Sequence, residues 1–262
     1  RRTFVGFGDP FFSSEQAKIA ANTAARAGNQ LATRGIPLKL RNAPKTAGVS
    51  SAELALLPRL PDTKEELQEI GKALSADPSQ DIFLNKDASV ARVMQMDLSN
   101  RQVVMFATHG LVPGELDGLS QPALALSAPD VTGEVKGDGL LTMEKILTLK
   151  LNADWVVLSA CNTASGEGAG AEAVSGLGRA FFYAGARALL VSNWPVDSEA
   201  ARMLMTDMFK RQQTKPGQNK AEYLQASMVN MMDAVGSTDG KGKMKYSYAH
   251  PLFWAPFVVV GD

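Results

Sequence analysis

The chain has 262 residues, 45% hydrophobic and 7% aromatic, which is enough for a full core in one large domain or in one with an appended lobe. Its 27 Lys and Arg balance its 27 Asp and Glu, so nothing indicates a polyanionic partner such as nucleic acid. No membrane span or secretory signal peptide is visible, and a single cysteine excludes an internal disulfide, so we expect a protein of the reducing cytoplasm. The chain begins Arg1-Arg2 without Met, and we expect it to be a fragment of a longer protein whose missing part lies on the amino side.

The first predicted strand covers residues 3–7 and stops at the turn Gly8-Asp9-Pro10. Apolar residues then keep no sustained period over residues 11–61, so we predict a long insertion or partly ordered excursion there. A helix follows, which Asp62 or Thr63 can cap and whose apolar positions recur at helical spacing.

Helical and strand patterns then alternate along the chain. A strand at 81–84, a short helix at 88–96 and a buried strand at 103–106 complete a β-α-β-α-β progression, which gives a parallel sheet with right-handed crossovers. Beyond it we predict a loop with a short strand at 111–130, a helix at 141–149 and a second buried strand at 155–158.

The remaining elements are predicted from the same signals. A helix from residue 171 is ended by Gly185, and a buried strand follows at 188–191. Asp197 begins a helix as its N-cap, and Asn219 with Glu222 resembles a capping box before another helix, whose methionines we interpret as core filler. We expect a flexible basic loop over 236–245 and a last strand at 257–260.

Two reactive side chains follow the two buried strands. His109 comes after the strand at 103–106, and Cys161 comes after the strand at 155–158. The carboxyl ends of parallel strands share one edge of the sheet, where ligands bind, and a thiol with an imidazole can carry out nucleophilic acyl transfer. A lone cysteine is also commonly a buried small hydrophobe, but a cysteine about 50 residues after a histidine favours a caspase-like hydrolase.

Three rival interpretations have weaker support. His250 precedes Pro251 on the aromatic approach to the last strand, a context that fixes backbone rather than exposing a base. Gly168 to Ala173 fits the dinucleotide fingerprint G-x-G-x-x-A, but these glycines begin several residues beyond the strand that should precede them. His and Cys are too few for a zinc site, and no Walker lysine is present, so we expect neither a metal nor a cofactor.

Five motifs occur in a characteristic order: ATHG, SACNT, GEGAGAEAVSGLGRAFFYAGA, SNWPVDSEAA and HPLFWAPFVVVGD. Together they closely resemble the CHAT domain, a caspase-like family often attached to tetratricopeptide repeats, from about Leu57 to Asp262. The resemblance implies one α/β domain over residues 1–262, caspase-like, with a largely parallel central sheet flanked by helices on both faces. It also implies a cysteine endopeptidase that uses a dyad of His109 and Cys161, cleaves a protein substrate and is activated by a repeat domain or another signalling partner.

The resemblance extends to the surroundings of the dyad. It assigns the oxyanion donors to the backbone N–H groups of Gly110 and Cys161, and it implies that the loop at 192–197 lines the specificity pocket, for which Asp197 and Ser159 are the candidates. Asp197 as a helix cap and nothing more stays an open alternative. A catalytically silent signalling or scaffolding module of the same fold is the alternative function.

Overall fold

The computed structural model describes residues 1–23, 54–135, 137–159, 169–193, 196–234, 236–238 and 244–261. In this part of the chain, the central sheet has six strands in the order β11-β8-β7-β3-β1-β2. Every neighbouring pair is parallel except β11 with β8. The strands are β1 (Arg2–Gly8), β2 (Ile82–Leu84), β3 (Arg101–Ala107), β7 (Trp155–Leu158), β8 (Ala188–Ser192) and β11 (Phe257–Gly261). The predicted largely parallel sheet is confirmed.

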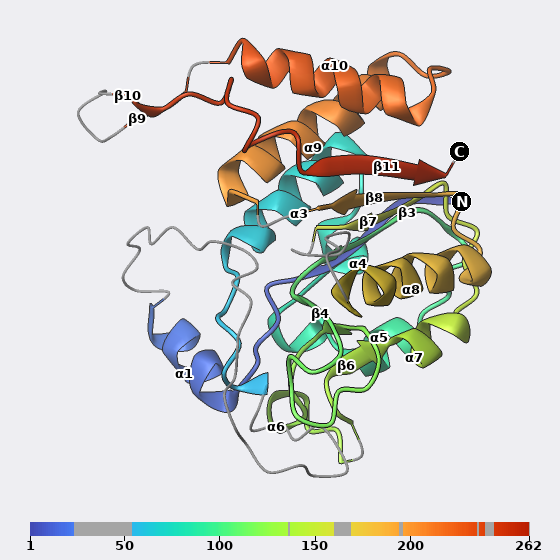
Figure 1. Cartoon of the computed structure of the whole chain (residues 1–262). Coiled ribbons are helices and arrows are strands. Elements are labelled where there is room, and N and C mark those ends of the chain that lie inside the picture. Colours follow the sequence, from blue (N-terminus) through green and yellow to red (C-terminus); the bar gives the residue numbers. More distant parts are fainter. Residues whose placement is uncertain are drawn as a thin grey trace.

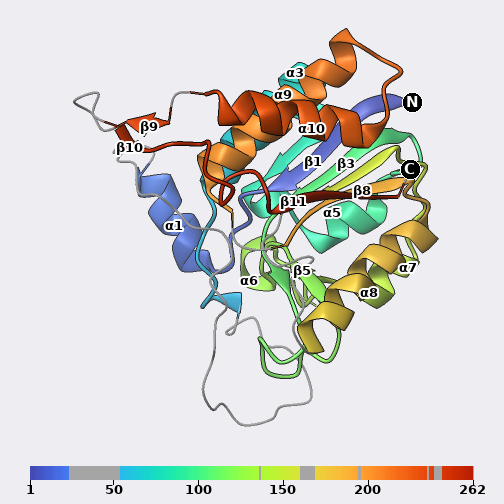
Figure 2. The same cartoon turned by 45° about the horizontal axis from the view of Figure 1, so that its top comes forward.

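Helices cover both faces of this sheet (Figure 1; Figure 2). One face carries α3 (Asp62–Ala73), α9 (Ser198–Thr214) and α10 (Lys220–Met232); the other carries α5 (Val90–Gln95), α7 (Met143–Leu147) and α8 (Ala169–Ala184). Successive strand side chains point to opposite faces, so Val103 and Met105 join the first core whereas Val104 and Phe106 join the second. The architecture is therefore the expected α/β fold, with a largely parallel central sheet flanked by helices on both faces.

The end of β3 is fixed by aromatic packing. Phe106 stacks on Phe7 of β1, with ring centroids 5.4 Å apart, and meets Phe181 of α8 at 5.7 Å. All three rings are fully buried, and each contributes roughly 1.5–3 kcal/mol from burial alone. The residues that follow Phe106 therefore leave the sheet from a rigid base.

A small second sheet lies beside this end of β3. It consists of β4 (Gly110–Leu111), β5 (Ala123–Ala125) and β6 (Leu140–Thr142), paired in that order. The helix predicted at 141–149 is correct only in its later part, because Leu140 and Leu141 bury their side chains in a strand paired with β5. The helix α7 begins at Met143, where Thr142 caps it.

Residues 11–61 are described at both ends, and residues 24–53 lie outside the described part. A helix, α1 (Ser14–Thr23), occurs where the sequence pattern indicated none. Phe12, Leu54 and Leu57 are buried in a third core cluster together with residues of the small sheet. The ends of this range therefore belong to the packed structure that adjoins β4 to β6.

Several predicted helix ends are confirmed. Asp197 caps α9 by accepting the Ala200 N–H at 2.9 Å, Asn219 caps α10, and Gly185 ends α8 with a φ of 112°. The predicted cap of α3 is wrong: Pro61 occupies the N-cap, and the Thr63 hydroxyl donates to the Leu60 carbonyl instead.

The predicted loop at 236–245 is wrong at both of its ends. There β9 (Ser237–Thr238) pairs with β10 (Met244–Tyr246) in an antiparallel arrangement, because only the central residues have the Gly- and Lys-rich composition of a turn. Short helical turns complete the described elements at α4 (Pro78–Asp81), Asn85–Asp87 and α6 (Pro129–Thr132).

Candidate active site

His109 lies just beyond the carboxyl end of β3 and is 6% exposed. Its backbone carbonyl accepts the N–H of Ala125 in β5 at 2.9 Å. The hydroxyl of the preceding residue, Thr108, donates to the Ala125 carbonyl. Strand β5 of the small sheet therefore fixes the backbone of His109 through hydrogen bonds to Thr108 and His109.

The imidazole ring of His109 is held by groups far away in the sequence. Its Nε2 atom lies 2.8 Å from the backbone carbonyl oxygen of Pro58. A carbonyl only accepts, so Nε2 carries the hydrogen, and in the neutral ring the lone pair is then on Nδ1. The ring of Phe12 packs against the imidazole with centroids 5.4 Å apart. These contacts set both the orientation and the tautomer of the ring.

Cys161 lies outside the described residues, but the strand that leads to it is described. In the ladder between β3 and β7, Phe106 pairs with Leu158 in parallel register. His109 and Cys161 are each the third residue after this pair. Of the two predicted backbone donors, only Gly110 is among the described residues. It is half-buried at the start of β4, where it pairs with Leu124 of β5.

Ser159, a predicted pocket residue, contacts a carboxylate that the sequence interpretation missed. Its hydroxyl donates to Oε1 of Glu66 at 2.9 Å, and the two residues are 1% and 0% exposed. Glu66 comes from α3, where it shares a helical face with buried Thr63 and Ile70. A carboxylate at a core-facing position was the signal available in the sequence, since Glu is almost never fully buried without a partner.

Asp197, the other predicted pocket residue, lies at the carboxyl end of β8 and uses Oδ1 to cap α9. Its surroundings are acidic. Burial raises the pKa of Tyr248, and the carboxylates of Glu199 and Asp197 raise it further. Two carboxylates, those of Asp197 and Glu199, therefore lie near the Tyr248 hydroxyl.

The second histidine, His250, precedes β11 in the chain. His250 is exposed, and its Nδ1 accepts the N–H of Leu252 at 3.1 Å. The dinucleotide alternative also lacks the expected spacing, since β7 ends at Leu158 whereas the fingerprint begins only at Gly168. In the part of the chain that the structure describes, no group of three or more His, Cys, Asp and Glu has the arrangement of a metal site.

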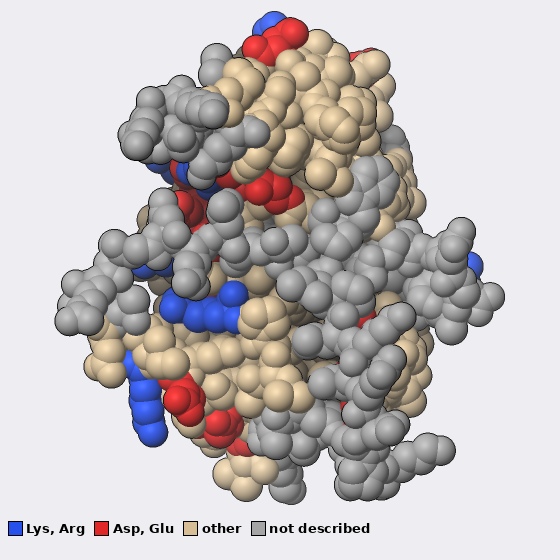
Figure 3. Space-filling view, turned by 60° about the vertical axis from the view of Figure 1, so that its left-hand side comes forward, with Lys and Arg blue, Asp and Glu red and all other residues tan. Residues whose placement is uncertain are grey.

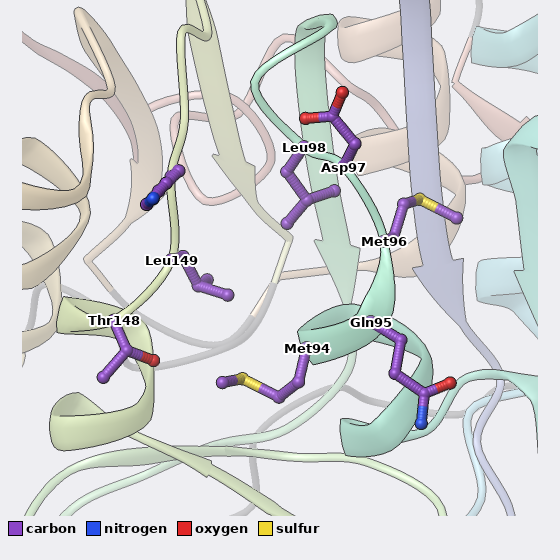
Figure 4. Close-up of a pocket in the computed structure, with 8 residues that line it drawn as sticks. Met94, Gln95, Met96, Asp97, Leu98, Thr148 and Leu149 are labelled. Atoms are coloured by element: carbon purple, nitrogen blue, oxygen red, sulfur yellow. The ribbon is translucent and has the colours of Figure 1, made fainter.

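Figure 3 shows the side of the molecule toward which the parallel strands run. Among the described residues that this view shows, acidic and basic side chains are interspersed. A separate cavity of about 300 Å³ opens at the opposite edge of the sheet. Figure 4 shows the side chains of Met94, Leu98 and Leu149 directed toward this space, which lies between the ends of α5 and α7. Within the described residues, no helix is long and apolar enough to cross a membrane.

Comparison with known proteins agrees with this architecture. Residues 7–262 match the CHAT domain family. Tetratricopeptide repeat protein 28 of Mus musculus is 26% identical over 232 residues, and Tetratricopeptide repeat protein 28 of Homo sapiens is 30% identical over 126 residues. These matches cover 78% and 47% of the chain but only 9% and 4% of the two relatives, so the chain spans less than a tenth of either. Since the family match takes in nearly the whole chain and its caspase-like sheet, this protein belongs to the CHAT domain family.

Proposed function

We propose that this CHAT domain is a cysteine endopeptidase that uses Cys161 as nucleophile and His109 as base. The observation that carries the proposal is the register between β3 and β7, in which Phe106 pairs with Leu158 and each reactive residue follows three positions later. A second support is the hydrogen bond from His109 Nε2 to the Pro58 carbonyl, which leaves Nδ1 as the proton-accepting atom.

The chemistry proceeds in two stages. Nδ1 of His109 takes the thiol proton, the Cys161 sulfur bonds to the peptide carbonyl carbon, and the carbonyl electrons move to the oxygen. The N–H groups of Gly110 and Cys161 stabilise that oxyanion. When it collapses, the C–N bond breaks and Nδ1 returns the proton to the leaving amine. Water, deprotonated by His109, then hydrolyses the thioester and regenerates the thiol. The Pro58 carbonyl accepts from Nε2–H throughout and stabilises the imidazolium.

Substitution of the two residues tests the proposal. Cys161→Ala and His109→Ala should each lower cleavage of a peptide library by about a thousandfold or more, and by similar amounts, because members of a catalytic unit do not act additively. Neither change should unfold the domain. His250→Ala is the matched control, since His250 is exposed on a turn, and it should keep full activity. Turnover of peptides by a folded Cys161→Ala protein would contradict the assignment of Cys161 as the nucleophile.

Substrate preference is the second part of the proposal. Asp197 and Glu199 supply negative charge at the carboxyl end of β8, and Ser159 is backed by Glu66, so we propose a preference for Arg or Lys on the amino side of the scissile bond. Asn is as good an N-cap as Asp, so Asp197→Asn should spare α9 while lowering kcat/KM for Arg and Lys peptides by roughly ten- to a hundredfold. Neutral peptides should be unaffected. An unchanged preference would leave Asp197 as a cap alone.

A further inference from the structure

The Pro58 carbonyl contacts the imidazole of His109, although Pro58 itself is exposed. Its neighbours hold it on both sides. The Leu57 carbonyl accepts from the side-chain amide of Gln16 at 2.8 Å. On the other side, Arg59 directs its side chain back toward the end of β1. The position of the Pro58 carbonyl therefore depends on these two anchors.

Arg59 makes a bidentate ion pair with Asp9. Its Nε lies 2.8 Å from Oδ1 and its Nη2 lies 2.6 Å from Oδ2. Asp9 is 0% exposed, and the guanidinium also lies over the ring of Phe11, 4.9 Å from its centroid. A planar group that is held at two nitrogens and against a ring has little freedom to rotate.

Asp9 is itself fixed by the central sheet. It follows Gly8, which pairs with Ala107 of β3, so it leaves β1 beside the strand that carries His109. Its backbone N–H donates to the Thr63 hydroxyl at 2.7 Å, and its carbonyl accepts from the Asn85 N–H at 3.1 Å. Its φ is 46°, a left-handed conformation that Asp and Asn adopt more readily than most residues. The carboxylate is thus a fixed point of the sheet.

We propose that the Asp9–Arg59 ion pair positions His109 through the Pro58 carbonyl. Arg59 and Pro58 share a peptide bond, so the ion pair fixes the direction of the Pro58 carbonyl, and that carbonyl fixes the tautomer and plane of the imidazole. Asp9 and Arg59 act as positioning residues and need not touch a substrate. The inference rests on the proposed role of His109 as the base, since only a base needs Nδ1 to carry the lone pair.

The two ring nitrogens of His109 provide a test that needs no substrate. The chain has two histidines, and His250 accepts the Leu252 N–H at Nδ1, so its own tautomer serves as an internal reference. Nitrogen-15 spectra are recorded at pH 8.5, where an ordinary imidazole is neutral. The protein carries Cys161→Ala, so that no thiol influences the ring. The unmodified ion pair should give His109 as the Nε2–H tautomer. Arg59→Gln should give a mixture of both tautomers, while His250 stays unchanged.

Two further variants separate positioning from loss of stability. Arg59→Lys keeps the charge next to Asp9 but cannot bind both carboxylate oxygens in one plane, so it should fold and still mix the tautomers. Arg101→Gln breaks another buried ion pair, with Asp81 at the opposite edge of the sheet, and should leave the tautomer of His109 intact. A single Nε2–H tautomer in folded Arg59→Gln and Arg59→Lys proteins would overturn the proposal.

The alkylation rate of Cys161 by iodoacetamide connects this inference to the proposed function. With the thiol restored, Arg59→Gln should lower that rate at pH 7 by about ten- to a hundredfold, because small displacements of a catalytic group have effects of this size. Arg101→Gln should not lower it. If the single substitution His109→Ala does not change the rate of Cys161 alkylation, the proposed dyad is wrong. The nitrogen-15 spectra are independent of that result and decide whether the ion pair orients the ring of His109.

Discussion

Asp9 carries its charge without any exposed surface, and its counter-charge, Arg59, is 29% exposed. Ionising a buried carboxylate costs free energy that a single ion pair does not always return, so such pairs are weak indicators of stability. Removal of Arg59 alone leaves that carboxylate without its bidentate partner. We expect Arg59→Gln to lower the free energy of unfolding by about 2–4 kcal/mol, the lower part of this range reflecting the partial exposure of Arg59.

The double variant Asp9→Asn/Arg59→Gln should be more stable than Arg59→Gln, because it removes the stranded charge as well. Asn tolerates the left-handed backbone of residue 9, so this change isolates the charge. Urea unfolding of the wild type, the two single variants and the double variant measures the coupling. Additive losses in this cycle would show that the two charges do not interact.

The burial of Asp9 predicts that the free energy of unfolding depends on pH. Burial raises the pKa of Asp9 above its ordinary value of 3.8; Arg59 and Lys64 oppose the rise, and Asp62 adds to it. The folded state then binds this proton more tightly than the unfolded state does. The stabilising contribution of protonated Asp9 is complete below pH 3.8 and is lost as the pH rises through the raised pKa. The stability of Asp9→Asn relative to wild type should therefore increase across this window, and an opposite slope in urea unfolding would contradict the assignment.

At the scale of single residues, sequence and structure inform different parts of the site. His109 and its order relative to Cys161 can be predicted because each follows a strand with an uninterrupted apolar pattern. The roles of Pro58 and Arg59 cannot be predicted in this way, and for Glu66 only the core-facing position can be predicted, not the partner. Their partners are 51, 50 and 93 residues away along the chain, and no local period links such positions.

At the scale of elements, the buried strands are the most predictable part of the fold, since a strand covered on both faces must be apolar throughout. The same rule explains the error at residues 141–149. A short apolar run does not distinguish a buried strand from a buried helix, and the pairing of Leu141 with Leu124 is a tertiary choice. Residues 11–61 show a different failure, because the sequence of α1 contains only one large apolar side chain, Ile19, and this side chain is exposed.

Gly185 gives a test of how α8 ends. Its φ is +112°, and a Cβ there would lie 2.2 Å from the Leu151 carbonyl oxygen. Gly217 is a matched control, with a φ of +102° and no atom within 4 Å of the added Cβ. Gly217→Ala should cost about 1–2 kcal/mol from backbone strain alone, and Gly185→Ala should cost about 3 kcal/mol or more because a backbone contact is also displaced. Equal costs in urea unfolding would contradict this account.

At the scale of the whole molecule, His109 follows the carboxyl end of β3, and Figure 1 shows both marked chain ends at the opposite edge of the central sheet. The curated relatives are tetratricopeptide repeat proteins of much greater length. We propose that a repeat domain or partner shifts this domain toward a competent arrangement of its site. The isolated domain should then cleave peptides weakly, and a longer protein that includes the repeats should be more active with its effector. High and equal activity in every form would contradict gating.

The proposed dyad requires that His109 activates Cys161. Because the chain has a single cysteine, the rate of its alkylation by iodoacetamide at pH 6, followed by mass, reports on that residue alone. A free thiol has a pKa near 8.5 and is almost entirely protonated at this pH, whereas an imidazole-paired thiol is largely thiolate. We predict that the folded domain reacts at least about tenfold faster than the chain unfolded in urea, that His109→Ala abolishes the difference and that His250→Ala keeps it. Reaction of the folded domain no faster than the unfolded chain would contradict the dyad and favour a catalytically silent scaffold.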